Sequence, residues 1–319
     1  CADSRIIIMK TMINVEISFF ENLNSEDIIY HYTKASTAID FILYKNELRF
    51  NKARLSNDPI ESKKPERCTI SMVETEISKS HSDDVDELHA FIDDLEERFN
   101  QICFCQNSRN KNYISSFEGN EELFGFTKLR MWDQYADKFS GVCIAFSKEK
   151  ILSLNKHKFD LIEDNVSYLT FKQLYLNKVG HIQIEHLKNF GKEKYKEQLE
   201  NSLKQSFFYK HNDYSGENEY RIGTFFDKRK CSVEKFQDEL FFDKNMMLDI
   251  SGCIEAIFVS SYANDKQKNA LLEYADKLNI KLVEMQWKYN SFVVNDYKDW
   301  KDFIDGINKR KIKKQKPYT

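Results

Sequence analysis

The irregular order of strand-forming and helix-forming segments limits the fold of this chain more than any other feature. Residues 141–146 (GVCIAF) are a continuous apolar run typical of a buried strand, and residues 253–260 predict another strand. Helical patterns of unequal length separate such runs, without the regular alternation of a doubly wound fold. We therefore predict an α+β fold, with a single domain that carries helical insertions.

Other segments fit the same architecture. β-Branched and aromatic residues predict a strand over 27–33, followed by a short amphipathic helix for which Ser36 is a candidate N-cap. An extended segment begins at 48–50 and ends at the turn signal of residues 56–59 (SNDP). Further strands are predicted over 101–106, 217–226, 280–286 and 291–294, and helices over 129–138, most of 171–208, and 265–278.

A helix of different character is predicted over residues 83–99. Its apolar residues recur three and four positions apart, and acidic residues occupy the other positions. One interpretation is a coiled-coil seam for dimerisation, but the pattern lasts only about two heptads, whereas a coiled coil needs three or four. We favour an acidic surface helix packed on the core. The apolar positions are Val85, Leu88, Ile92, Leu95 and Phe99.

The composition excludes several classes of protein. A formal net charge of -3 argues against polyanion binding through bulk electrostatics. No apolar stretch approaches the roughly 20 residues that a membrane span needs, and the N-terminus lacks the features of a signal peptide. The 7 cysteines are odd in number and scattered, which suits reduced thiols. We therefore predict a cytoplasmic protein with no membrane partner.

Three segments are predicted along the chain. Residues 1–24 form an N-terminal leader, in which the residues ahead of Met9 are interpreted as additions before a natural start. Residues 25–295 form the domain, and residues 296–319 form a C-terminal helix and a basic tail. The basic run within that tail (309–316) is interpreted as a solvated end rather than a nucleic-acid site.

The stretch Glu217-Asn-Glu-Tyr-Arg-Ile222 carries the most chemical information. In a strand, Glu217, Glu219 and Arg221 would share one face. Two neighbouring carboxylates raise the pKa of one of them, and a nearby Arg lowers it again. Considered alone, an exposed strand face with a weak Glu–Arg pair is the favoured interpretation. Alone, His31 and the pair Trp132 and Tyr135 likewise favour ordinary packing.

Familiar catalytic motifs do not occur in the sequence. It has no Walker loop, no G-x-G-x-x-G, no G-x-S-x-G and no H-E-x-x-H. Cys103 and Cys105 share a strand face, but no second Cys/His pair follows at the spacing of a structural zinc site. We therefore expect no metal, although a nuclease that uses the same carboxylates with a metal ion stays an alternative.

Six motifs occur in order along the chain: YHYT (30–33), LRFNKARLSNDP (48–59), MWDQYAD (131–137), GVCIAF (141–146), ENEYRI (217–222) and IEAIFVSS (254–261). Taken in this order, they resemble a bacterial domain-of-unknown-function family numbered 2971. That family in turn resembles the ADP-ribosyltransferase superfamily, whose H-Y-E branch has a His on the first strand, a Tyr before a middle strand and a Glu on a later strand. The resemblance covers roughly residues 25–295 and implies a split mixed β-sheet.

The resemblance implies a catalytic role for four residues. His31, with Thr33, resembles the H-x-T signature and would fix a ribose hydroxyl. Tyr135 would stack on nicotinamide. Glu219 resembles the catalytic glutamate, which stabilises the positive charge that develops on the ribose. Glu217 completes an E-x-E arrangement and would orient or deprotonate the acceptor.

The resemblance also implies a set of contacts to NAD. These include Trp132 beside Tyr135, and Tyr32 at the position where many family members have Gly. The residues predicted to bind the cofactor are His31, Tyr32, Thr33, Asn57, Trp132 and Tyr135.

The function implied is that of an NAD-dependent ADP-ribosyltransferase, or of an NAD glycohydrolase that uses water as acceptor. Its partners would be NAD and an unknown macromolecular acceptor, protein or nucleic acid. A toxin or antiphage-defence role follows by family analogy only. A non-catalytic nucleotide- or nucleic-acid-binding module is the main alternative, served by the clustered aromatics and the basic tail. A homo-oligomer stays open.

Overall fold

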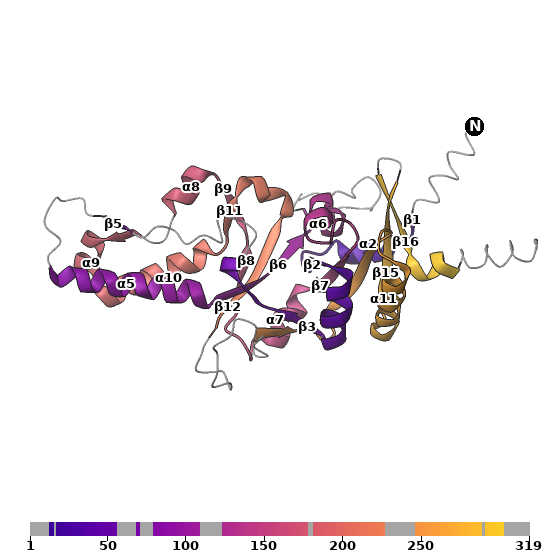
Figure 1. Cartoon of the computed structure of the whole chain (residues 1–319), viewed down its shortest axis with the longest axis horizontal. Coiled ribbons are helices and arrows are strands. Elements are labelled where there is room, and N and C mark those ends of the chain that lie inside the picture. The colour runs from indigo at the N-terminus through magenta and orange to yellow at the C-terminus, as the bar shows by residue number, and fades with distance from the viewer. Residues whose placement is uncertain are drawn as a thin grey trace, which may run out of the picture. The chain divides into compact units, whose positions relative to one another are not determined.

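A computed structural model describes residues 13–15, 17–55, 68–70, 79–108, 123–177, 181–226, 246–288 and 291–302 (Figure 1). The chain combines helices and strands and contains a mixed sheet, which confirms the predicted mixture of the two kinds of element. It divides into two compact units, each built from separate segments. Unit 1 comprises Cys1–Leu48, Phe104–Asn155 and Asp249–Thr319, and unit 2 comprises Arg49–Cys103 and Lys156–Leu248. The predicted single domain over 25–295 stays a prediction.

The sheet of unit 1 combines parallel and antiparallel pairs. Within it, β1 pairs with β16 in parallel and β14 with β15 in parallel, whereas the β15–β16, β14–β7 and β7–β2 pairs are antiparallel. The end of β6 pairs with β2. The predicted strands of this unit are confirmed to within two residues at each end. In sheet order the strands of the unit are β1 (Ile13–Asn14), for which no strand was predicted, β16 (Ser291–Asp296), β15 (Lys281–Lys288), β14 (Ile254–Ser260), β7 (Val142–Ser147), β2 (Ile28–Thr33) and β6 (Phe99–Gln106).

In the second half of strand β2, buried and partly exposed side chains alternate with the two-residue period of a strand. Tyr30 and Tyr32 are buried, whereas His31 and Thr33 on the other face are partly exposed. Gly141, just before β7, lies so close to the carbonyl oxygen of Thr33 that an added Cβ would clash with it. The close approach of the two strands therefore requires glycine at this position.

An aromatic cluster fills the core of unit 1. The rings of Phe126 and Phe258 stack with their centroids 4.1 Å apart, and Trp132 contacts Tyr32 edge to face at 5.4 Å. Every side chain of β7 is buried, which confirms the prediction from its apolar run. The helical elements of unit 1 are α2 (Ile17–Leu23), α3 (Ala35–Thr37), η1 (Ala38–Leu43), η4 (Gly125–Thr127), α6 (Leu129–Gln134), α7 (Lys148–Asn155) and α11 (Asp265–Leu278).

Unit 2 contains short strands around the first half of β6. β4 pairs with β6, β12 lies beside β6, and β8 pairs antiparallel with β12. Two further pairs are parallel: β9 with β11, and β5 with β10. The bounds are β4 (Asn51–Lys52), β5 (Cys68–Ile70), β8 (Ile162–Asn165), β9 (Ser167–Leu169), β10 (His181–Gln183), β11 (Tyr209–His211) and β12 (Glu219–Phe225); β3 (Glu47–Arg49) and β13 (Met247–Asp249) lie at the unit boundaries.

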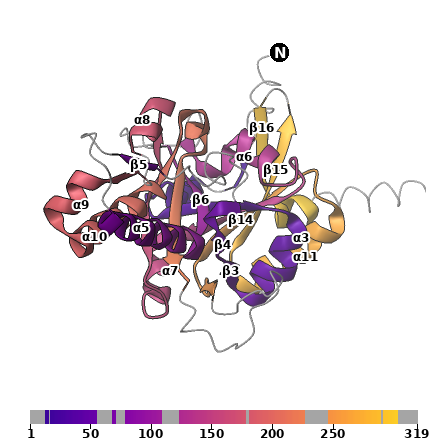
Figure 2. The ribbon, with the colours of Figure 1, turned by 60° about the vertical axis from the view of Figure 1, so that its left-hand side comes forward.

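The acidic helix of unit 2 packs on two neighbouring helices. Helix α5 (Lys79–Arg98) lies beside α10 (Lys192–Ser206), as both views show (Figure 1, Figure 2). Its apolar positions are buried against side chains of α9 (Ile184–Phe190) and α10. The prediction of a surface helix packed on the core is therefore confirmed. The remaining helical elements are η2 (Ala53–Leu55), α8 (Phe171–Leu176) and η5 (Asn212–Glu217).

Three predicted helices differ from those observed. The first begins at Ala35 after an N-cap at Lys34, so Ser36 is not the cap, and it continues as a π-helix. Helix α6 is shorter than predicted because Asp137 and the two residues after it have positive φ. The helical stretch 171–208 is interrupted by β10.

The two ends of the chain are described only in part. Residues 297–302 are helical, and the basic run 309–316 lies outside the described residues, so the predicted segment 296–319 stays a prediction. Among the helices that the structure describes, none combines the length and the apolar character needed to cross a membrane.

Candidate active site

Glu219 is the first residue of β12, and the chain before it differs from the predicted strand. Glu217 ends the 3-10 helix η5, and Asn218 has a left-handed backbone with φ 46. Asn tolerates this conformation better than most residues. The prediction that Glu217 lies in the strand is therefore wrong, because the left-handed residue breaks the two-residue period before Glu219.

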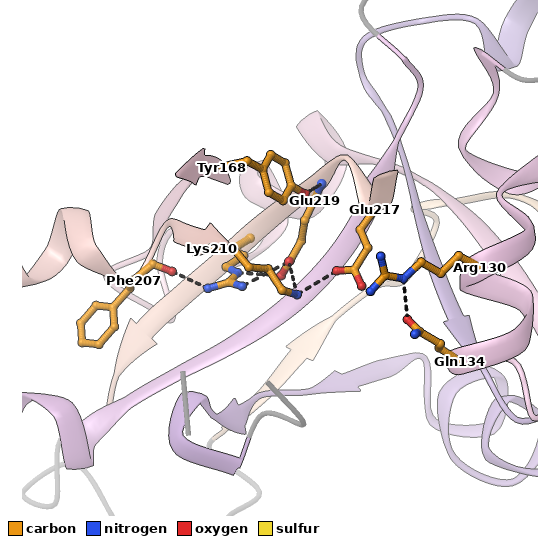
Figure 3. Close-up of polar contacts among 8 residues, drawn as sticks. Arg130, Gln134, Tyr168, Phe207, Lys210, Glu217 and Glu219 are labelled. Carbon is orange, nitrogen blue, oxygen red and sulfur yellow. Dashed lines mark hydrogen bonds and ion pairs between the residues drawn. The ribbon is translucent and has the colours of Figure 1, made fainter. Parts of the chain in front are cut away.

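Lys210 joins the two glutamates. Its Nζ donates to Glu217 Oε2 at 2.8 Å and to Glu219 Oε2 at 3.0 Å (Figure 3). Lys210 lies at the centre of the three-residue strand β11, next to η5. One ammonium group therefore holds both carboxylates at hydrogen-bond distance, although the two glutamates belong to different elements.

Arg221 completes the cluster from the same face of β12 as Glu219. Its Nε donates to Glu219 Oε1 at 2.6 Å and its Nη2 to Oε2 at 3.1 Å. Its Nη1 donates to the carbonyl oxygen of Phe207 at 2.6 Å. Residues two apart in a strand share a face, so the predicted pairing of Glu219 with Arg221 is confirmed, and the bidentate geometry fixes the carboxylate plane.

The cluster is buried. Lys210 and Glu219 are each 5% exposed, and Glu217 and Arg221 are each 2% exposed. The interpretation of an exposed strand face with a weak ion pair is therefore wrong. Burial of four charged groups is tolerable because two cations pair with two carboxylates.

Glu219 stays ionised in this environment. Burial alone would raise the pKa of its carboxyl group, but the charge and hydrogen bonds of Arg221 and the charge of Lys210 outweigh it and lower the pKa to about 2. The backbone N–H of Glu219 donates to the hydroxyl oxygen of Tyr168 at 2.8 Å. Burial raises the pKa of Tyr168, so that hydroxyl stays neutral.

The ionised Glu219 makes the stability of the protein depend on pH. Because its pKa falls from 4.5 in the unfolded chain to about 2 in the folded protein, the stabilisation is present above about pH 4.5 and is lost as the pH falls toward 2. We expect Glu219 to contribute a decrease of about 3 kcal/mol in the free energy of unfolding over that range. Urea unfolding at several pH values would measure it, and the same slope in Glu219→Gln would contradict the assignment.

The residues predicted from the first strand divide between the two faces of β2. The ring of His31 packs against Phe104, with the centroids 5.8 Å apart. Thr33 shares the partly exposed face with His31. Tyr32 faces the core, where its hydroxyl donates to the carbonyl oxygen of Gly125 at 2.6 Å. His31 and Thr33 are thus partly exposed, whereas Tyr32 packs in the core of unit 1.

Trp132 and Tyr135 differ in the same way. Trp132 is fully buried, and its indole N–H donates to the carbonyl oxygen of Phe126 at 2.7 Å. Its predicted contact with nicotinamide is corrected to core packing, because no part of the ring is exposed. Tyr135, at the C-cap of α6, is only partly buried against the core cluster, so a stacking role stays a prediction for this residue alone.

The predicted site residues come from both units. His31, Thr33 and Tyr135 belong to unit 1, and Glu217 and Glu219 to unit 2. Their convergence on one ligand stays a prediction. Asn57 lies outside the described residues.

Lys210 and Tyr168 are the site residues that sequence patterns missed. Tyr168 lies on β9 and Lys210 on β11. These two three-residue strands pair with each other although some forty residues separate them along the chain. Strands this short leave no periodicity to detect. The one signal in the sequence was that Lys210 lies between two aromatic-ring residues, Tyr209 and His211, shortly before Glu217.

Four free cysteines lie in the described part of the chain. Cys105, Cys143 and Cys253 are buried thiols and Cys103 is an exposed one. Within the described part of the chain, no group of three or more His, Cys, Asp and Glu side chains is placed to hold a metal ion. The buried carboxylates instead pair with Lys210 and Arg221.

One known protein family matches the chain. Residues 131–222 match the family described as "Protein of unknown function (DUF2971)". The match covers less than a third of the chain, and it includes Tyr135 and the whole Lys210–Glu217–Glu219–Arg221 cluster. No curated protein and no solved structure matches the chain.

Proposed function

We propose that the protein is an NAD-dependent ADP-ribosyltransferase, or an NAD glycohydrolase, with Glu219 as the central carboxylate. The observation that carries the proposal is the buried cluster in which Lys210 and Arg221 keep Glu219 ionised. Cleavage of the bond between nicotinamide and ribose develops positive charge on the ribose. A fixed, ionised carboxylate in a site poor in water stabilises that charge.

The two cations do not cancel this role. The four side chains of the cluster are one ammonium group, one guanidinium group and two carboxylates, so positive and negative formal charges alternate within it. Lys210 and Arg221 hold the Glu219 carboxylate in one orientation, so little reorganisation is needed when charge develops on the ribose. Glu217 accepts a hydrogen bond from the same ammonium group, and in this proposal it orients or deprotonates an acceptor.

The same proposal assigns roles to two residues of unit 1. His31 fixes a ribose hydroxyl through its partly exposed ring, and Tyr135 stacks on nicotinamide. The acceptor is a protein, a nucleic acid or water. A role as a toxin or in antiphage defence belongs to the proposal by family analogy.

Release of nicotinamide from NAD by the purified protein tests the proposal. We expect release that continues in the presence of a chelator, because the proposed chemistry uses no metal. A nuclease that uses the carboxylates with a metal ion would instead cleave nucleic acid and lose activity with chelator. Binding of NAD without release, in the presence of candidate acceptors, would indicate a non-catalytic nucleotide-binding module.

A further inference from the structure

Among the described residues that hydrogen-bond to the carboxylate of Glu219, one faces solvent. Lys210 and Arg221, which donate to both oxygens, are almost fully buried. The remaining partner is Cys103, whose side chain hydrogen-bonds to the carboxylate and is exposed. A ligand that approaches Glu219 from solvent therefore meets the thiol of Cys103 first.

Cys103 lies on β6, directly beside Glu219 on β12. The two strands are neighbours in the sheet, and Gly223 lies against the ring of Phe99. Phe99 precedes Cys103 by four residues, whereas Gly223 follows Glu219 by four, so the strands run antiparallel. Gln101, midway between Phe99 and Cys103, then lies opposite Arg221 and shares the face of Cys103.

Gln101 is a buried residue with an unused acceptor on this face. Its side chain is 6% exposed, and its Oε1 accepts no hydrogen bond from the residues that the structure describes. A buried acceptor left without a donor costs free energy that a ligand can recover by donating to it. This face therefore presents the Glu219 carboxylate, which is covered by the thiol of Cys103. It also presents the acceptor Gln101 Oε1, two residues from Cys103 along β6.

We propose that Cys103 and Gln101 form the ribose-recognition side of the Glu219 site. One ribose hydroxyl displaces the Cys103 thiol and donates to the Glu219 carboxylate, and the neighbouring hydroxyl donates to Gln101 Oε1. The Glu219 carboxylate and Gln101 Oε1 are both hydrogen-bond acceptors. A vicinal diol matches them because its two neighbouring hydroxyls can each donate one hydrogen bond. The inference rests on the proposed function, since the ribose is that of NAD.

Substitution of Cys103 tests the displacement through the direction of the change in affinity. Cys103→Ala removes the competitor for the carboxylate, and we expect the Kd for NAD to fall about threefold; Cys103→Ser supplies a stronger donor, and we expect the Kd to rise about threefold. A thiol with a merely structural role predicts the opposite order, with Ser close to the native protein and Ala weaker. That order would overturn the proposal.

Gln101→Leu separates ligand recognition from folding. Leu has a similar volume and removes the unused acceptor, so we expect equal or higher thermal stability together with a Kd for NAD raised about threefold or more. Unchanged affinity in a stably folded Gln101→Leu protein would exclude Gln101 from the site.

Alkylation of Cys103 by iodoacetamide, followed by peptide mass spectrometry, gives an independent measurement. The sulfur–carbon bond forms as iodide leaves and the thiol proton passes to solvent. We expect saturating NAD to slow alkylation and nicotinamide, which has no ribose, to leave it unchanged. Protection by nicotinamide, or none by NAD that calorimetry shows to be bound, would overturn the inference alone; absence of NAD binding would overturn the proposed function with it.

Discussion

Glu219→Gln is expected to lower the rate of nicotinamide release from NAD by at least about 100-fold. Gln keeps the size and one acceptor oxygen of the side chain but has no charge with which to stabilise the ribosyl cation. The measurement is nicotinamide release under single-turnover conditions, with NAD binding determined on the same samples. A rate within a few-fold of the native protein would contradict the central role of Glu219.

The same substitution also disturbs the fold, so it needs a matched control. Neutralising Glu219 takes a charged partner away from both Lys210 and Arg221, which are buried, and breaking a buried ion pair costs about 3–5 kcal/mol. Glu163→Gln is the control, because Glu163 accepts a hydrogen bond from Tyr220, whose side chain lies on the other face of β12. We expect full activity in the control, and activity should be compared at temperatures where both variants are folded.

Patterns that are local in sequence predicted their structures well. Helix α11 occupies the predicted residues 265–278 because Asn264 and Gln267 form a capping box, which depends only on neighbouring positions. Glu219 and Arg221 share a face because a strand repeats every two residues. Ser36 failed as a cap because the buried Ala35 already lies in the helix, one residue earlier.

The rest of the site depends on pairing between distant segments. The burial of Glu219 requires β11 and β9 to pair, which places Lys210 and Tyr168 around it, and neither strand is long enough to show a period. The strand begins only after Asn218, whose backbone is left-handed. The polar–apolar pattern of the sequence does not reveal a left-handed residue, so the stretch from Glu217 still looked like one continuous strand. The motif therefore predicted the wrong environment for the carboxylate of Glu219, an exposed strand face where the structure has a buried one.

Lys210→Met is expected to destabilise the protein by about 3–5 kcal/mol, because it removes the cation that two buried carboxylates share. Urea unfolding at neutral pH would measure the loss. Lys150→Met is the matched control: Lys150 also pairs with a glutamate, Glu255, at 2.6 Å, but its side chain is 56% exposed. An exposed pair contributes at most about 1 kcal/mol, so this substitution should be nearly neutral.

A double-mutant cycle then assigns the loss at Lys210 to its charge. In a Glu217→Gln background, Lys210→Met faces one buried carboxylate fewer, and Arg221 still pairs with Glu219. We therefore expect the cost of Lys210→Met to fall by at least about 1 kcal/mol in that background. An equal cost in both backgrounds would mean that Lys210 stabilises the fold through packing, including its contact with the ring of Tyr214 at 4.6 Å, rather than by joining the two glutamates.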